Sequence, residues 1–274
     1  MAVHLVLDNS NLAKTYDEIS DSQYNAGRTL VKKLGVKAGD SVLDIGAGTG
    51  RLGRYVSELI GLEGSLIGID PLEERIKIAN EKNEFANAIY QIGSAEKLDS
   101  IEDSSIDVVY LSSVFHWVID KKGSLREIFR VLKKGGKVGI TTSAKELSSF
   151  SDIRKITDSV LKRDHYVNFV DIDKSTQNQH GLTTTELITL LAQAGFQITD
   201  VQVLHHERKH ARAQDVVTFS EASSFGNYLN HVPEKLRNQA KKEIIAELEK
   251  LHDGNEITVD GYRTFAVATK HKII

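Results

Sequence analysis

The run from Val42 to Gly50 constrains the fold of this chain more than any other stretch. It reads VLDIGAGTG, which is a short apolar segment, one carboxylate at Asp44, and three glycines that alternate with other residues. Alternating glycines permit positive φ angles and let a ligand approach the backbone closely, because no Cβ is in the way. The run therefore predicts a strand over 41–45, a tight ligand-binding turn and a following helix.

The order of elements predicts an α/β fold. Apolar runs bounded by turn residues alternate with helical patterns, which is typical of βαβ units and a mostly parallel, doubly wound sheet. The helix after the glycine turn ends at Gly61. Two capping boxes, Ser124 with Glu127 and Thr183 with Glu186, predict helix starts. The strands expected are 41–45, 65–69, 88–92, 106–111 and 137–142, followed by a closing antiparallel pair at about 197–205 and 262–270.

Two segments, 144–182 and 211–254, interrupt this pattern after strand ends, where open α/β sheets bind ligands. The second contains an amphipathic helix that begins at Pro233. We expect a single domain over 1–274, with helical cap insertions that form a lid over the site. Its core is expected at about 35–143, 183–206 and 255–274, and its cap segments at 1–34, 144–182 and 207–254.

The strand–Asp-x-Gly-x-Gly-x-Gly–helix turn resembles the first motif of the class I, Rossmann-like S-adenosylmethionine-dependent methyltransferases. The resemblance is strong over 40–142 and otherwise rests on the order of elements. It implies a seven-stranded sheet with an antiparallel last strand, and S-adenosylmethionine as the cofactor. The cofactor-binding residues that it implies in the turn are Asp44, whose carboxylate would accept from the methionine ammonium, and Gly46, Ala47, Gly48 and Gly50.

Further cofactor contacts are expected after the second and third strands. Asp70, followed by Pro71, has two carboxylate oxygens that can take both ribose hydroxyls. The loop after the third strand often reads Gly-Asp-Ala in this family, with the acidic side chain on the adenine amino group. Ser94 stands here in the place of that Asp, before Ala95, and Glu96 is the candidate to substitute for it.

The fourth strand and the loop after it line the cofactor and face the acceptor in this fold. Leu111 and Ser112 are the cofactor-binding residues implied there, and Ser112 matches a position that often touches the cofactor. Near the N-terminus, Tyr16 resembles an aromatic residue that closes over the cofactor in many relatives.

His116 and Trp117 resemble an aromatic pair of small-molecule carboxyl methyltransferases of the trans-aconitate, malonyl-carrier and juvenile-hormone-acid types. Both are therefore expected to bind the substrate. His116 is the candidate catalytic residue, because a neutral imidazole can act as a base near pH 7. A structural or cofactor-packing role is the alternative for each.

The glycine turn also has a dinucleotide interpretation. The stretch Gly48–Gly53 matches G-x-G-x-x-G, with Asp70 about 20 residues further on. Counted from Gly46, however, the third glycine position is Arg51. In this interpretation Asp44 would be a buried carboxylate without a partner, which costs free energy. The motif therefore favours the methyltransferase, with a dehydrogenase as the weakest alternative.

The stretch His205–His210, HHERKH, invites a metal interpretation. Adjacent residues on a strand point to opposite faces, so His205 and His206 cannot easily share one ion. A basic sheet edge or substrate-side patch is favoured, and no metal site is predicted.

Composition limits the function classes. The 274 residues, 40% hydrophobic and 27% charged, suit an ordinary globular protein with a proper core. A formal net charge of −3 gives no footprint for a nucleic-acid partner. The absence of cysteine excludes disulfides, thiolate metal sites and methyl transfer that needs catalytic or arsenic-binding thiols. No signal peptide or membrane span is evident, so a cytoplasmic location without a membrane partner is expected. The oligomeric state stays open.

Methyl transfer from a sulfonium is an in-line displacement, so the protein has mainly to align acceptor and methyl and to exclude water. We predict a small-molecule methyltransferase, with a carboxylate or hydroxyl oxygen as acceptor slightly favoured over nitrogen. A methyltransferase acting on a protein or RNA is the first alternative, and a catalytically silent cofactor-binding subunit is the second.

Overall fold

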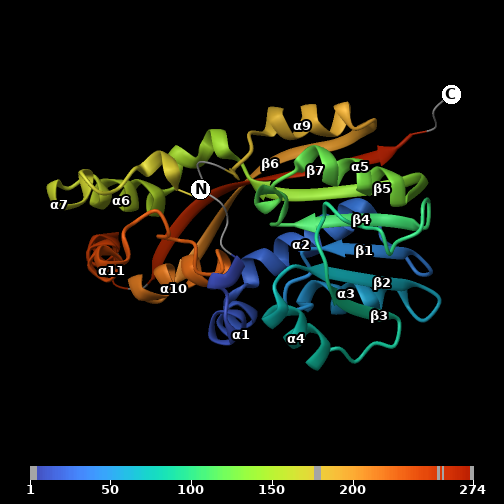
Figure 1. The fold of residues 1–274 in the computed structure, drawn as a ribbon, viewed down its shortest axis with the longest axis horizontal. Coiled ribbons are helices and arrows are strands. Elements are labelled where there is room, and N and C mark those ends of the chain that lie inside the picture. Colours follow the sequence, from blue (N-terminus) through green and yellow to red (C-terminus); the bar gives the residue numbers. More distant parts are fainter. Residues whose placement is uncertain (1–4, 176–179, 252–253, 255, 272–274) are drawn as a thin grey trace. The chain divides into compact units, whose positions relative to one another are not determined.

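The computed structural model of the protein describes residues 5–175, 180–251, 254 and 256–271. Its strands form one seven-stranded sheet in the order β3-β2-β1-β4-β5-β7-β6 (Figure 1). The pairs β1–β2, β2–β3, β1–β4 and β4–β5 are parallel, and the last strands are antiparallel, so the predicted fold class is confirmed. The strands are β1 (Ser41–Ile45), β2 (Ser65–Asp70), β3 (Ala88–Ile92), β4 (Ile106–Ser112), β5 (Leu132–Ser143), β6 (Phe196–His210) and β7 (Ile257–Lys270).

The chain divides into two compact units. The sheet unit consists of Asp21–Thr142, Leu182–Val203 and Thr264–Ile274, and the helical unit of Met1–Ser20, Ser143–Gly181 and Leu204–Arg263. Strands β6 and β7 contribute residues to both units. Within the described residues, no helix is both long and apolar enough to cross a membrane.

In the sheet unit, helices cover both faces of the sheet because successive strand residues point to opposite sides. Val42 and Tyr110 face α2 (Asp21–Leu34), α3 (Arg51–Ile60) and α4 (Glu73–Glu81). Leu43 and Leu111 face α5 (Lys121–Val131) and α9 (Thr184–Gln193). The short 3-10 helix η2 (Phe115–Trp117) follows β4. The core therefore has two apolar layers with the sheet between them.

The direction of strand addition reverses between β1 and β4. From β1 the chain adds β2 and β3 on one side, and then returns to place β4 and β5 on the other. Ligands of open α/β sheets bind at such a switch point, outside the carboxyl ends of the strands. The parallel register places Asp44 beside Tyr110 and Ile45 beside Ile69. The end of β1 is thus where a ligand site is expected.

Helix ends follow the local sequence with one exception. Gly61, at φ +64°, ends α3, and Thr183 with Glu186 forms the predicted capping box of α9. The prediction for Ser124 was wrong, because α5 begins at Lys121 and Asp120 caps it by accepting from the Gly123 N–H at 2.8 Å. Strands β5, β6 and β7 are longer than expected. For β5 the reason is that its first residue, Leu132, already pairs with β4, and the strand continues past an irregularity in register.

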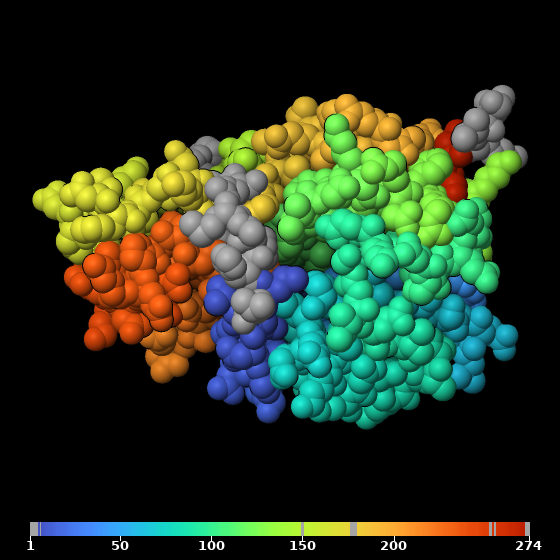
Figure 2. Space-filling view, viewed as in Figure 1, coloured from blue at the N-terminus to red at the C-terminus, as the bar shows by residue number. Residues whose placement is uncertain are grey.

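The helical unit has its own apolar core around Val217, Ile244 and Val259. Helix α11 contacts α6, and the yellow and orange segments that carry these helices abut in Figure 2. Arg163 forms an ion pair with Glu243 of α11 at 2.6 Å. The α-helices of the helical unit are α1 (Ser10–Ile19), α6 (Asp152–Leu161), α7 (Asp164–Val167), α10 (Ala213–Ser223) and α11 (Glu234–Leu248). Its short 3-10 helices are η1 (Leu5–Leu7), η3 (Lys145–Phe150), η4 (Ile172–Lys174) and η5 (Glu249–Leu251).

Candidate active site

The glycine turn leaves β1 in a left-handed conformation at each of its three glycines. The φ angles of Gly46, Gly48 and Gly50 are +77°, +55° and +73°. The backbone N–H groups of Gly46 and Ala47 donate to the carbonyl of Ile69 at 2.7 and 3.0 Å, which fastens the turn to β2. Residues with a side chain rarely adopt this backbone conformation, so the turn requires glycine.

The loop after β4 presses against this turn. A Cβ at Gly46 would lie 2.9 Å from the Cβ of Val114 and closer still to both of its methyl groups. Ser112 ends β4 half-buried, and Ser113 takes a left-handed φ of +62° while its N–H donates to Thr141. Such backbone strain at a residue other than glycine clusters at functional sites. The predicted contact Leu111 has its side chain in the core, with no exposed area.

Asp44 is a buried carboxylate at the end of β1, only 2% exposed. The hydroxyl of Tyr110, on the neighbouring strand, donates to its Oδ2 at 2.7 Å. Burial raises the pKa of Asp44 to about 7, the Tyr110 hydrogen bond works against this, and the charge of Asp70 adds to it. Near neutral pH this carboxyl therefore takes and loses a proton readily, and a cation beside it would favour the charged form.

Asp70 supports the turn from the end of β2. Its Oδ2 accepts from the N–H of Gly48 and its Oδ1 from the N–H of Leu72, both at 2.9 Å. A carboxylate offers about four acceptor positions, so one such side chain can accept from more than two donors. Pro71, the next residue, is exposed.

The loop after β3 is tied to the loop after β4. The half-buried Glu96 accepts from the N–H of Ile119 at 3.2 Å. Ala95 is buried, and half-buried Ser94 forms an isolated antiparallel bridge with Lys97. The three residues expected to reach the adenine therefore form a short turn after the carboxyl end of β3, on the same edge of the sheet as the glycine turn after β1.

His116 and Trp117 lie half-buried in η2 after β4. Their rings are 4.8 Å apart between centroids and tilted by 47°. The Nδ1 atom of His116 is 3.0 Å from the Oγ1 of Thr142, which is buried on β5. This hydrogen bond orients the ring.

Tyr16, the remaining predicted cofactor contact, lies half-buried on α1 in the helical unit. The other predicted site residues all belong to the sheet unit, at the carboxyl ends of β1, β2 and β4 or on the loops that follow β1, β2, β3 and β4.

The HHERKH stretch lies in β6, where successive side chains point to opposite faces of the strand. His205 and Glu207 share a face, and their ligand atoms lie within 4.8 Å of each other and of Asp260 on β7. His205 Nε2 is 3.3 Å from Asp260 Oδ1, an ion pair when the imidazole is protonated. His206 is not part of this cluster, in agreement with the argument from alternation.

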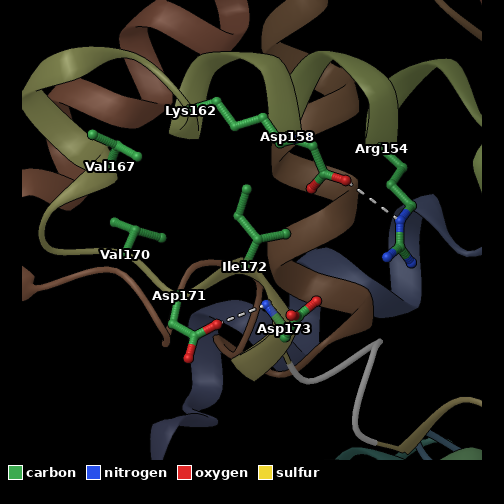
Figure 3. Close-up of a pocket in the computed structure, with 8 residues that line it drawn as sticks. All are labelled: Arg154, Asp158, Lys162, Val167, Val170, Asp171, Ile172 and Asp173. Carbon is green, nitrogen blue, oxygen red and sulfur yellow. Dashed lines mark hydrogen bonds and ion pairs between the residues drawn. The ribbon is translucent and has the colours of Figure 1, made fainter.

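A pocket of about 630 Å³ lies in the helical unit, beside α6, α7 and η4 (Figure 3). Its lining contains both cations and carboxylates, and Nε of Arg154 lies 3.7 Å from Oδ2 of Asp158. Burial raises the pKa of Asp158 above its ordinary value. None of the residues predicted for the site lines it.

Three residues that stabilise the site were missed from the sequence: Tyr110, Val114 and Thr142. Each contacts a residue far away in the sequence, so no local motif indicates it. Tyr110 was the easiest of the three to predict, because β1 and β4 are parallel neighbours and their register pairs it directly with Asp44. Its hydroxyl also means that Asp44 has a protein partner, which the sequence argument against a dinucleotide had not considered.

Residues 43–140 match the family model described as "Methyltransferase domain". The fold is the Rossmann-like fold of class I methyltransferases, whose cofactor is S-adenosylmethionine. The residues present are compatible with that cofactor, since two buried carboxylates flank a turn in which a Cβ at Gly46 would collide with Val114.

Similar proteins agree with this assignment. The chain is 35% identical over 136 residues to an arsenite methyltransferase of Aquipseudomonas alcaligenes, covering 46% of this chain and 38% of that protein. It is 34% identical over 140 residues to a demethylmenaquinone methyltransferase of Lactobacillus johnsonii, covering 48% and 57%. The chain thus spans about half the length, or less, of these curated relatives. The YcgJ protein from Bacillus subtilis shares the fold, with a TM-score of 0.62 at 18% identity over 90% of this chain and 99% of that one.

Proposed function

We propose that this protein transfers the methyl group of S-adenosylmethionine to a small-molecule acceptor, with a carboxylate or hydroxyl oxygen as the first choice of acceptor atom. The observation that carries the proposal is the pair Asp44 and Asp70, buried at the ends of adjacent parallel strands on either side of the glycine turn. Relatives named for arsenite and demethylmenaquinone support a small acceptor over a macromolecule.

Each cofactor contact that the resemblance implies has a proposed residue. Asp44 takes the methionine ammonium, and Asp70 takes the ribose hydroxyls while holding the turn through Gly48. The turn of Ser94, Ala95 and Glu96 receives the adenine. Ser112 and Tyr16 are proposed as further contacts.

The cofactor supplies an activated methyl group, so the protein needs to orient the acceptor and to keep water out. A carboxylate acceptor needs no base. A hydroxyl acceptor must lose its proton, and His116, whose ring is held by Thr142 through Nδ1, is the proposed base. Trp117 is proposed to contact the acceptor beside it.

Arsenite is a poor candidate acceptor for this chain. Soft thiolates are the ligands expected for such a substrate, and the chain has no cysteine. A quinone, an organic acid or an alcohol remains a suitable test compound.

Calorimetric titration with S-adenosylhomocysteine, with NADH in parallel, tests the proposal. We expect binding of the first alone, and a loss of about 1–3 kcal/mol of binding free energy in Asp44→Ala and Asp70→Ala. Binding of NADH alone, or unchanged affinity in both variants, would refute the cofactor assignment. Tritium transfer to a panel of small acids, alcohols, amines and quinones then identifies the acceptor, and transfer only to RNA or protein would overturn the small-molecule assignment.

A further inference from the structure

The exposed face of β6 carries metal-binding side chains that the proposed function does not use. His205 and Glu207 lie two positions apart on this strand, so alternation directs both to the same face. Asp260, on the neighbouring strand β7, meets them there. One donor atom from each of the three residues lies within 4.8 Å of the other two. All three residues belong to the helical unit.

The distances within this set suit a small ion. Tetrahedral ligands that each lie about 2.0–2.2 Å from Zn²⁺ are about 3.3–3.6 Å from one another. Nε2 of His205 and Oδ1 of Asp260 are 3.3 Å apart, so this pair already has that spacing. The separations from the donor atom of Glu207 need to shorten by at most about 1.5 Å. Rotation about the side-chain bonds of an exposed glutamate covers that distance.

Glu207 is available as the third ligand. Its carboxylate forms no hydrogen bond or ion pair with any other residue that the structure describes. Lys209, the next residue on the same face of β6, pairs with Glu256 instead, at 3.3 Å. Metal binding therefore breaks no existing polar contact of the Glu207 side chain.

The imidazole of His205 packs beside a tyrosine. Its ring centroid lies 5.3 Å from that of Tyr262, two residues after Asp260 on β7, and the two rings are tilted by 57°. This contact restricts the rotation of the imidazole. His205 and Asp260 thus approach each other from adjacent strands with part of their side-chain freedom already lost, which lowers the entropic cost of binding an ion.

The donor set points to a divalent ion of the first transition row. An imidazole nitrogen suits Zn²⁺ and its neighbours, whereas Mg²⁺ and Ca²⁺ take oxygen ligands. An imidazole ligates in its neutral form, so the two carboxylates balance the charge of the ion. Three protein ligands leave the fourth position of a tetrahedral site for a water molecule.

We propose that His205, Glu207 and Asp260 bind one divalent transition-metal ion, with Zn²⁺ as the first choice, on the exposed face of β6 and β7. No metal site was predicted from the sequence, because His205 and His206 point to opposite faces of the strand. The set that the fold assembles does not use His206 and takes its third ligand from β7. A bound ion fastens β6, the last strand in the order of the sheet, to its neighbour.

The inference goes beyond the proposed function and does not depend on it, because metal binding is measured without cofactor or acceptor. Calorimetric titration of the full chain with zinc chloride, after treatment with EDTA and removal of the chelator, tests it. We expect the tightest site to bind one Zn²⁺ per chain, and magnesium chloride to bind much more weakly. In His205→Gln, Glu207→Gln and Asp260→Asn the affinity for Zn²⁺ should fall at least about tenfold, since each variant removes one of three ligands.

Two matched controls remove the same chemical groups outside the set. His165→Gln deletes an exposed imidazole that also lies beside a carboxylate, that of Glu243 at 3.0 Å. Glu256→Gln deletes an exposed carboxylate just before β7. Both variants should bind Zn²⁺ like the wild type.

Thermal unfolding gives a second measurement. Zn²⁺ should raise the unfolding midpoint of the wild type but not of Glu207→Gln, because the unfolded chain does not bring the two strands together. Without metal the two proteins should unfold at the same temperature, since the exposed Glu207 has no polar contact to lose among the described residues.

Equal affinity for Zn²⁺ in the wild type and Glu207→Gln, or equal binding of Zn²⁺ and Mg²⁺, would overturn the inference. A loss confined to the His205 and Asp260 variants would also overturn it, because it would leave a two-residue contact and not a three-ligand site. None of the variants changes a proposed cofactor contact, so each should bind S-adenosylhomocysteine like the wild type. Zn²⁺ binding without cofactor binding would contradict only the proposed function, and the reverse would contradict only the metal site.

Discussion

The hydroxyl of Tyr110 donates to Oδ2 of Asp44 at 2.7 Å, joining β4 to the end of β1 at the point where the sheet changes direction. The hydrogen bond stabilises the charged form of the carboxyl, but burial outweighs it and the pKa of Asp44 still rises to about 7. At neutral pH the protein therefore holds, at its switch point, a carboxyl that is only partly charged. A bound ammonium group would favour its charged form.

Cofactor binding should release a proton from Asp44. At pH 6 the free protein holds this carboxyl mostly protonated, and a bound ammonium lowers its pKa, so the proton leaves. Affinity for S-adenosylhomocysteine should rise with pH up to about 7 and then level off. Calorimetry at pH 6 in buffers of different ionisation enthalpy measures the released proton, and heats independent of the buffer would contradict this assignment.

Asp44→Asn should remove that proton release and weaken cofactor binding. Tyr110→Phe is the matched variant, because it keeps the carboxyl and deletes only the hydroxyl. Without this hydrogen bond the pKa of Asp44 should rise further, so the pH dependence of binding should move upward instead of disappearing. Equal pH profiles in the wild type and in Tyr110→Phe would show that the hydrogen bond plays no part.

Asp44 also makes stability depend on pH. Its pKa is about 7 in the folded chain against an ordinary value of 3.8, so the unfolded state loses the proton first. Its contribution to stability should therefore be highest below pH 3.8, fall as the pH rises through the window up to about 7, and stay low above it. The difference in unfolding free energy between the wild type and Asp44→Asn, followed across pH 4–8 with urea, measures this contribution.

Gly46→Ala should destabilise the protein more than backbone strain alone explains. Gly39→Ala is the control, since Gly39 has a φ of +83° with nothing within 4 Å of an added Cβ. Strain should cost about 1–2 kcal/mol in both variants, and Gly46→Ala should lose more through its collision with Val114. The double variant with Val114→Ala should recover part of the difference in thermal unfolding. Equal losses at the two glycines would contradict the close approach.

His116→Ala separates a base from a structural residue. If the acceptor is a hydroxyl, the rate of methyl transfer should fall by about 10²–10⁴ while affinity for S-adenosylhomocysteine stays unchanged. Thr142→Val, which removes only the partner of Nδ1, should lower the rate less. A loss of cofactor affinity equal to the loss of rate would point to a packing role instead.

Asp120→Ala should destabilise the protein by about 1 kcal/mol through loss of the cap of α5. Ser124→Ala should cost less, because its hydroxyl donates to the carbonyl of Lys121 inside the helix and caps nothing. Urea unfolding of both variants compares the observed start of α5 with the start expected from the capping-box pattern.

Local patterns were enough to predict the alternation of elements, the strand 41–45 with its glycine turn, and the helix ends at Gly61 and Thr183. These features depend on backbone preferences and on neighbours within one turn, which the sequence carries directly. The start of α5 was predicted wrongly from the same kind of pattern, because Asp120 and not Ser124 caps the folded helix.

The sequence by itself determined the class of sheet, the position of the ligand turn and the carboxylates Asp44 and Asp70 at strand ends. Tertiary structure alone decided what those groups touch: Tyr110 donates to Asp44, and Val114 lies against Gly46. Strand pairing and burial join residues far apart in the chain, and burial sets the pKa of Asp44. Neither the pairing register nor the loss of solvent is encoded in any one segment, so both appear only when the chain has folded.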